Sequence, residues 1–190
     1  MTSTSSCAKK TSARETSMNN STYVHHYLKP LLDKDKIAVD MTIGNGNDTL
    51  FLADLCRYVY AFDIAEQALV NTRKRLGEKD NVKLLLDSHV NVDKYVKDAD
   101  LFLFNLGYLP HCEQPTVTKA SDTKIAVEKA YSLLKENGLL VITFYLGHPG
   151  GREEYELVSS YIRNCGYRVI DTYVQEKPES PITYIIRKAP

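Results

Sequence analysis

The sequence predicts an α/β protein built on a doubly wound, Rossmann-like mixed sheet of seven strands. Two observations lead to this fold class. Short apolar runs alternate with segments of helical periodicity, and a parallel strand pair needs such a crossover helix to return the chain. The last two apolar runs follow one another without a helix, which predicts an antiparallel pair that supplies the antiparallel edge strand.

The first half of the chain alternates between the two patterns. The expected elements are a helix at 23–32, a strand at 37–40, a helix at 48–57, a strand at 58–63, a helix at 66–76, a strand at 82–86 and a short helix at 90–96. In the helix at 66–76, Ala68, Leu69 and Leu76 share one face, and Gly77 is well placed to end it. Three successive strands end in a carboxylate, at Asp40, Asp63 and Asp87.

The second half continues the alternation and then closes the sheet. The expected elements are a strand at 99–105, a helix at 121–136, a strand at 139–145, a helix at 152–165, and strands at 167–174 and 181–187. Asn137 and Gly138 are expected to end the long helix. In the following helix, Tyr155, Val158 and Ile162 recur at helical spacing and predict one buried face.

The size of the chain predicts one domain. With 190 residues, 43% hydrophobic and 25% charged, it can bury one substantial core and is too short for two domains of ordinary size. We expect a single domain over 23–190 after a flexible leader over 1–22, half of whose residues are Ser or Thr. An organellar transit segment is the less favoured interpretation of the leader. No apolar run reaches the roughly 18 residues that span a bilayer, so no membrane contact and a cytoplasmic location are expected.

Charge and cysteine content narrow the function classes. The 24 basic and 24 acidic residues balance, so any RNA contact must come from a local patch. The four cysteines form neither a CxxC pair nor a zinc spacing, so no metal site is predicted. Cys112 has no activating group nearby in sequence, which disfavours a nucleophilic role. His25 and His26 are adjacent on the first expected helix, and ordinary surface or packing roles are favoured over lining a site.

The stretch from Ile37 to Thr49 is the expected cofactor site. It joins the strand that ends at Asp40 to a helix that begins near Asp48, through the turn Gly44-Asn45-Gly46. Such a turn lets backbone N–H groups approach a polar ligand. A dinucleotide-binding loop would have a third glycine in place of Thr49, and Asp48 would repel a pyrophosphate. Asp40 and Asp48 suit the ammonium and sulfonium of S-adenosylmethionine, which is therefore the predicted cofactor, with NAD as the less favoured alternative.

Other strand ends supply further contacts to the cofactor. In such sheets, ligands bind beyond the carboxyl ends of the strands, near the switch in strand order. Asp63 is expected there to accept hydrogen bonds from both ribose hydroxyls, and Asp87-Ser88-His89 to meet the adenine edge. Each of these aspartates has an alternative role as the cap of the following helix.

Two later loops carry the expected substrate contacts. In amino-directed methyltransferases of this fold, the loop after the fourth strand holds the target nitrogen with a side-chain amide, a backbone carbonyl and an aromatic ring. Asn105-Leu106-Gly107-Tyr108 has these parts in this order. The alternative for Asn105 is a hydrogen bond that ties the loop to the backbone. His148, after the fifth strand, is the best candidate for a general base, although a turn or substrate-contact role is favoured for it.

Five motifs together resemble one family. They are G-N-G-N-D-T at 44–49, F-D-I at 62–64, S-H at 88–89, F-N-L-G-Y-L-P at 104–110 and Y-L-G-H-P-G-G at 145–151. These motifs are similar to those of the MnmM family of bacterial tRNA wobble-uridine aminomethyl methyltransferases, over about residues 23–188. The resemblance implies a class I methyltransferase fold and methyl transfer from S-adenosylmethionine to the amine of 5-aminomethyl-2-thiouridine in the tRNA anticodon loop.

The resemblance also implies roles for individual residues. The residues that would surround the cofactor are Asp40, Gly44, Asn45, Gly46, Asp48, Thr49, Asp63, Gln67, Ser88, His89 and Asn105. The residues that would face the uridine are Asn105, Tyr108 and His148, with Tyr108 and Tyr145 stacking on the extruded base. The residues that would meet anticodon-loop phosphates are Lys119, Lys124, Arg152, Arg187 and Lys188, each of which is more often a solvated charge.

Two other functions are compatible with the same residues. The first is a methyltransferase that uses the same cofactor on rRNA, another RNA, a protein or a small amine. The second is a module that binds the cofactor without catalysis.

Overall fold

The computed structural model describes residues 18–107, 119–176 and 179–190. The expected substrate contact Tyr108, the disfavoured nucleophile Cys112 and most of the predicted leader lie outside these residues. Within them, no helix is long and apolar enough to cross a membrane.

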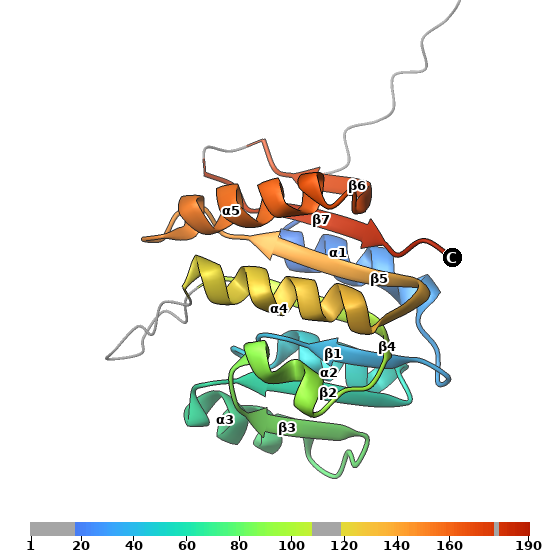
Figure 1. Ribbon diagram of the computed structural model, residues 1–190. Helices are drawn as coiled ribbons and strands as arrows, with labels where there is room; N and C mark the ends of the chain where they lie inside the picture. The colour runs from blue at the N-terminus through green and yellow to red at the C-terminus, as the bar shows by residue number, and fades with distance from the viewer. Residues whose placement is uncertain (1–17, 108–118, 177–178) are drawn as a thin grey trace, which may run out of the picture.

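Seven strands form one sheet in the order β3-β2-β1-β4-β5-β7-β6 (Figure 1). Their bounds are β1 (Ile37–Asp40), β2 (Tyr58–Asp63), β3 (Val82–Leu86), β4 (Ala99–Leu106), β5 (Leu134–Phe144), β6 (Arg168–Val174) and β7 (Ile182–Arg187). The first five are parallel, and β7 runs antiparallel to β5 and β6. The predicted doubly wound mixed sheet is confirmed, with the antiparallel strand lying between β5 and the edge strand β6.

Helices cover both faces of the sheet. They are α1 (Asn20–Leu28), α2 (Asn47–Leu55), α3 (Glu66–Leu76), α4 (Ala120–Leu133) and α5 (Gly151–Asn164), with short 3-10 helices η1 (Lys29–Leu31) and η2 (His89–Lys94). Alternation along β4 divides the core, because Phe102 and Phe104 pack in one cluster with α4, α5 and η2, whereas Leu101 and Leu103 pack in another with α1 and α2. Figure 1 shows α4 and α5 in front of the sheet and α1 and α2 behind it.

Helix α1 begins before the expected boundary at Tyr23. Asn19 caps it, with its side chain accepting a hydrogen bond from the backbone N–H of Thr22 at 2.8 Å. Asn20 is buried and its Nδ2 donates to Oγ1 of Thr183 at 2.9 Å. Residues 20–22, expected to belong to the leader, are therefore part of the first helix.

Asn137 and Gly138 do not end a helix as expected. Helix α4 stops at Leu133 and β5 follows directly, so both residues lie within the strand. Asn137 has a φ of 62°, and the β4–β5 register shifts at this point. A Cβ on Gly138 would lie 2.9 Å from the carbonyl oxygen of Asp100. Glycine is needed here for the close approach of two strands at an irregularity.

Candidate functional site

The candidate site lies beyond the carboxyl ends of β1 and β4, where the strand order reverses. Ligands bind at this switch point in open α/β sheets. Two hydrogen bonds join the strand ends: the backbone N–H of Met41 donates to the carbonyl of Leu103 at 2.8 Å, and that of Asn105 donates to Oγ1 of Thr42 at 2.8 Å. The two predicted site loops are therefore adjacent.

The loop from β1 to α2 turns at two glycines and is hydrogen-bonded to α3. Gly44 and Gly46 have φ values of 51° and 74°, in the left-handed region that favours glycine. Arg75 of α3 donates to the carbonyl oxygen of Asn45, and to Oδ1 of Asn47 at 2.8 Å. Arg75, which the sequence did not single out, thus holds the turn against the neighbouring helix.

Replacing Gly46 with alanine is expected to destabilise the fold more than the same change at Gly166. Both glycines have left-handed φ values, 74° and 68°, so each substitution introduces backbone strain of about 1–3 kcal/mol. Only at Gly46 would the new Cβ meet another residue, because it would lie 2.3 Å from Oγ1 of Thr72, whereas nothing lies within 4 Å at Gly166. Thermal unfolding of the two variants measures the difference. Equal losses would contradict the close contact between the loop and α3.

Asp40 is a fully buried carboxylate at the end of β1. It accepts hydrogen bonds from Oγ1 of Thr49 at 2.6 Å and from the backbone N–H of Thr42 at 3.1 Å. Burial, together with the negative charges of Asp48 and Asp63, raises the pKa of Asp40 to about 7. A cation bound beside it would favour the ionised form, so the site suits a positively charged ligand.

Asp48 joins three elements in the first turn of α2. Its Oδ1 lies 2.5 Å from Nε2 of His25 on α1, and its Oδ2 accepts a hydrogen bond from Nδ2 of Asn105 at the end of β4. The ring of His25 also stacks on Phe51, with centroids 3.9 Å apart. The structure thus brings Asp48 and Asn105 together as predicted. It adds His25, for which a role at the site was the less favoured interpretation.

Asp63 binds the backbone on both sides of the predicted ribose site, but its side chain does not cap α3. Its oxygens accept from the backbone N–H groups of Gly44 and Ala65, each at 2.9 Å. Each carboxylate oxygen can accept a second hydrogen bond, so Asp63 retains capacity for a ligand hydroxyl. Ile64, next to it, and Leu86 at the end of β3 are 50% and 54% exposed. These two side chains provide apolar surface for a flat ring beside Asp63.

The segment after β3 is ordered by its own side chains. Asp87 accepts hydrogen bonds from the backbone N–H of Ser88, from Asn91 at 2.8 Å and from the hydroxyl of Tyr95 at 2.8 Å. The hydrogen bonds from Asn91 and Tyr95 lower the pKa of Asp87. Ser88 caps η2 by accepting from the backbone N–H of Val90 at 3.3 Å. Asp87 thus has three local donors and keeps one acceptor position on Oδ2, so its adenine contact stays a prediction.

His89 and Gln67 occupy different surroundings. His89 is buried, and this burial lowers its pKa, so the imidazole is neutral at pH 7. Its Nε2 has no hydrogen-bond partner among the residues that the structure describes. Gln67 lies on the exposed side of α3, where its Nε2 donates to Oδ1 of Asn71 at 2.8 Å. Of these two predicted cofactor contacts, only His89 offers an unused buried polar atom.

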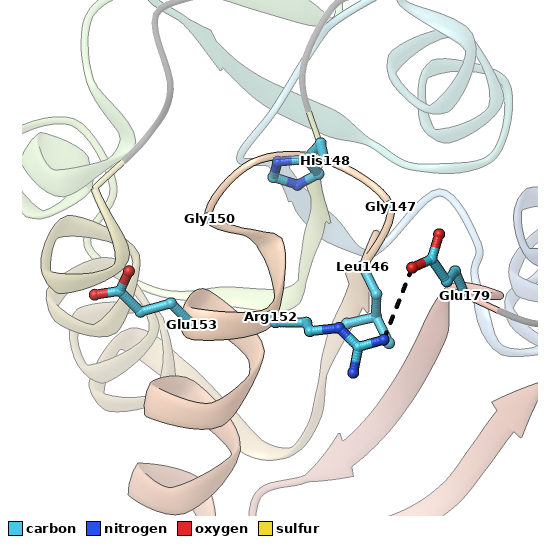
Figure 2. Close-up of a pocket in the computed structure, with 7 residues that line it drawn as sticks. All are labelled: Leu146, Gly147, His148, Gly150, Arg152, Glu153 and Glu179. Atoms are coloured by element: carbon cyan, nitrogen blue, oxygen red, sulfur yellow. Dashed lines mark ion pairs between the residues drawn. The ribbon is translucent and has the colours of Figure 1, made fainter.

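The loop after β5 forms a hollow of about 460 Å³ (Figure 2). The residues that line it are Leu146, Gly147, His148, Gly150, Arg152, Glu153 and Glu179. Nδ1 of His148 lies 3.0 Å from the carbonyl oxygen of Pro149, a contact typical of a turn. Arg152 and Glu179 face each other across the hollow at 3.8 Å.

Two residues connect this loop to the rest of the fold. The buried Glu154 accepts from Oγ1 of Thr123 at 2.5 Å, which joins the first turns of α5 and α4. Burial raises the pKa of Glu154, and the hydrogen bond from Thr123 and the charge of His148 oppose this shift. The backbone N–H of Tyr145 donates to the carbonyl oxygen of Leu106 at 3.1 Å, which joins the loop after β5 to the end of β4. Burial and the charge of Asp48 raise the pKa of Tyr145. The β5 loop therefore borders the same site as the β1 loop.

Comparison with known proteins identifies the family. The profile of the family described as "Putative rRNA methylase" matches residues 59–188, which include the β4 and β5 loops. The chain belongs to this rRNA methylase family. An rRNA methylase from Streptococcus thermophilus is 33% identical, with a TM-score of 0.75 over 93% of this chain and 100% of that one.

Two further relatives inform the choice of cofactor and substrate. A "putative methyltransferase" from Streptococcus mutans, in complex with SAH, is 34% identical, with a TM-score of 0.80 over 91% of this chain and 99% of that one. An Arabidopsis thaliana protein named tRNA (mnm(5)s(2)U34)-methyltransferase, chloroplastic, is 35% identical over 72% of this chain. The match spans 56% of the length of that relative.

Membership of the rRNA methylase family confirms the resemblance found in the sequence. The class I methyltransferase fold is confirmed. SAH, the product that S-adenosylmethionine leaves after methyl transfer, is bound in the Streptococcus mutans relative. The roles of the individual site residues stay predictions, as do the leader and the cytoplasmic location. Sequence reasoning did not select three residues that border the site: His25, Arg75 and Glu154. Each of them binds a partner on another helix or loop, and such a contact leaves no signal in the local sequence.

Proposed function

We propose that this rRNA methylase family member transfers a methyl group from S-adenosylmethionine to the primary amine of 5-aminomethyl-2-thiouridine at the tRNA wobble position. The product is 5-methylaminomethyl-2-thiouridine. The name of the Arabidopsis relative supports this substrate. The observation in the structure that carries the proposal is the orientation of Asn105 beside the cofactor loop.

Asn105 presents a hydrogen-bond acceptor to the site. A carboxylate only accepts hydrogen bonds, so the amide nitrogen of Asn105 must be the group that faces Asp48. The carbonyl Oδ1 of Asn105 is left without a donor among the described residues. An acceptor at this position suits a substrate that carries N–H groups, such as a primary amine.

The amine must lose a proton before or during transfer. At pH 7, only roughly one molecule in a thousand of an alkylamine with a pKa of about 10 is neutral. Removing the proton at this pH therefore costs about 4 kcal/mol of free energy. The sulfonium of the bound cofactor and a partly apolar pocket would both lower that pKa. Oδ1 of Asn105 would hold an N–H group and so direct the nitrogen lone pair at the methyl group, while the proton passes to water. His148 is retained as the candidate base, although its contact with Pro149 favours a turn role.

The residues of the β1 and β2 ends fit the cofactor. Asp40 and Asp48 would compensate its ammonium and sulfonium, and Asp63 would accept from a ribose hydroxyl through its remaining lone pairs. The exposed side chains of Ile64 and Leu86 would lie against the adenine ring. S-Adenosylmethionine supplies an electrophilic methyl group, and these residues bind and orient it.

Affinity for S-adenosylmethionine is expected to rise from pH 6 to pH 8 by up to about tenfold. The pKa of Asp40 is raised to about 7 in the free protein, so below this pH the carboxyl is mostly protonated and must ionise to pair with the cation. Above pH 7 no proton has to be released, and the affinity levels off. Isothermal titration calorimetry at pH 6, 7 and 8 measures the effect. The Asp40→Asn variant should bind weakly with little pH dependence, and an unchanged slope in that variant would assign the titration to another group.

Three of the five predicted phosphate contacts lie at the carboxyl ends of the parallel strands, where the candidate site is. Lys119 precedes α4, Lys124 lies in its second turn, and Arg152 lies in the first turn of α5. Arg187 and Lys188 lie at the opposite ends of the strands from the site. The reason is that β7 is antiparallel to β5, and Arg187 pairs with Leu139 at the irregular start of the β4–β5 pairing. Lys188 instead donates to the carbonyl oxygens of Ser132 and Leu134. Arg187 and Lys188 therefore lie away from the other three residues, and their contact with anticodon-loop phosphates stays a prediction.

The proposed function is tested with tRNA that carries 5-aminomethyl-2-thiouridine. Incubation with the protein and S-adenosylmethionine should convert this nucleoside to its N-methyl form, detected by mass spectrometry after digestion. The matched control is the same tRNA with 2-thiouridine and no aminomethyl group, which should remain unchanged. No product from the aminomethyl tRNA would overturn the proposal.

The description of the family favours rRNA as a second candidate substrate. Ribosomal RNA from cells that lack the protein should then gain a methyl group in the same assay. Methylation of rRNA without methylation of tRNA would select this alternative.

A further inference from the structure

His25 is connected to the proposed methyl-acceptor site through a continuous chain of side chains. Its Nε2 is 2.5 Å from Oδ1 of Asp48, and Oδ2 of the same carboxylate accepts from Nδ2 of Asn105. The three residues come from α1, α2 and β4, so the chain crosses three separate elements. Each oxygen of Asp48 thus has one partner, His25 on Oδ1 and Asn105 on Oδ2.

Helix α1 is anchored firmly enough to position its histidine. At its start, Asn20 donates to the carbonyl of Pro181 at 3.1 Å and to Oγ1 of Thr183 at 2.9 Å. One turn later, the hydroxyl of Tyr23 donates to Asp171 of β6, and its ring stacks on Tyr173 at 3.9 Å. These contacts hold α1 against β6 and β7, at the far edge of the sheet from α3.

The ring of His25 is fixed in its plane as well as in its position. It is stacked on Phe51 of α2 with an angle of 5° between the two planes. This packing leaves Nε2 directed at Asp48. His26, by contrast, is exposed and points away from this contact, since adjacent helical residues face different sides.

Asn105 depends on Asp48 for its side-chain orientation. Among the described residues, the only hydrogen bond of its side chain is the one to Asp48. The side chain of Asp48 is only 13% exposed, so a carboxylate oxygen without a donor would turn toward water or toward another donor. Either movement would change the direction in which Oδ1 of Asn105 points.

We propose that His25 is a positioning residue for the methyl transfer: it holds Asp48, and Asp48 holds Asn105 with Oδ1 directed at the substrate amine. His25 touches neither the methyl group nor the amine in this role. The inference rests on the proposed function, since it explains how the acceptor is oriented for that reaction.

Steady-state kinetics on the aminomethyl tRNA test this role. His25→Ala should lower kcat by roughly 10- to 100-fold, the range expected when a hydrogen bond to a charged group is lost. KM for the tRNA and Kd for S-adenosylmethionine should change by less than about threefold. His25→Gln, whose amide nitrogen can also donate to Asp48, should recover most of kcat. His26→Ala is the matched control and should retain kcat within about twofold.

A double substitution tests whether His25 acts through Asn105. Under single-turnover conditions, adding His25→Ala to Asn105→Ala should lower the rate no further, because the residue that His25 positions is already absent. Three results would each overturn the positioning role alone. They are a further 10- to 100-fold loss of rate in the double variant, no recovery of kcat by His25→Gln, and a normal kcat in His25→Ala. No product with the unaltered protein would overturn the proposed function and this role together.

Discussion

Replacing Asn105 with alanine is expected to lower kcat by roughly 100- to 1,000-fold, a range typical for loss of one group that holds the reacting centre. The affinity for S-adenosylmethionine should stay within about threefold. The reason is that the amide of Asn105 is the group proposed to accept a hydrogen bond from the substrate amine, whereas the proposed cofactor contacts of Asp40 and the loop backbone remain. Rates with aminomethyl tRNA and calorimetry with the cofactor separate these two quantities.

Asn164 supplies the matched control for this substitution. It is an exposed asparagine at the last position of α5, at the edge of the sheet away from the site. Asn164→Ala should leave both kcat and cofactor affinity unchanged within about twofold. An Asn105→Ala variant that turns over normally would mean that the amide has no part in the reaction.

Replacing Asp48 with asparagine is expected to impair both steps. The affinity for S-adenosylmethionine should fall about tenfold because one negative charge beside the cation is lost, and kcat should fall about 100-fold. An asparagine at this position has one acceptor oxygen, which can accept from His25 or from Asn105 but not keep both contacts. Its own N–H₂ group would face the other donor, so that hydrogen bond would be lost. The same kinetic and calorimetric measurements apply.

The control for Asp48 lies on the same helix. Asp54, near the other end of α2, pairs with Lys79 at 2.7 Å, and its side chain is 64% exposed. Exposed ion pairs contribute little, so Asp54→Asn should change cofactor affinity and kcat by less than about twofold. If Asp48→Asn behaved like Asp54→Asn, the carboxylate of Asp48 would have no role in binding or orientation.

Local sequence patterns were sufficient to predict the fold and the strand ends at which the predicted site loops meet. The carboxylates at Asp40 and Asp63 end parallel strands, and such strand ends meet at one edge of the sheet. Asn105 also follows from a local pattern, because it lies near the carboxyl end of the fourth strand, Ala99–Leu106. These predictions depend on periodicity and on the ends of elements, which are visible in one dimension.

Pairings between distant elements were not predictable in the same way. The contact of His25 with Asp48 spans 23 residues and depends on how α1 packs across α2, for which the sequence carries no periodic signal. Arg75 reaches the loop at Asn45 from another helix across 30 residues. Without these tertiary contacts, His25 and Arg75 look like ordinary surface residues.

Some local patterns also allowed two structural outcomes. Asn137-Gly138 is typical of a helix end, and here it allows β5 to approach β4 at a register shift. The backbone N–H groups of Gly44 and Ala65 occupy part of the acceptor capacity of Asp63, which the sequence had assigned to ribose. At Asn137-Gly138 a contact between two strands selected the outcome, whereas Asp63 keeps capacity for a ligand hydroxyl.

A competition experiment tests the central claim most directly. The protein is given S-adenosylmethionine with a trideuterated methyl group, together with equal amounts of aminomethyl-thiouridine tRNA and rRNA from cells that lack the protein. The digested nucleosides are then analysed by mass spectrometry. The proposed function predicts the label in 5-methylaminomethyl-2-thiouridine and in no rRNA nucleoside. Label in rRNA alone, or in neither RNA, would contradict it.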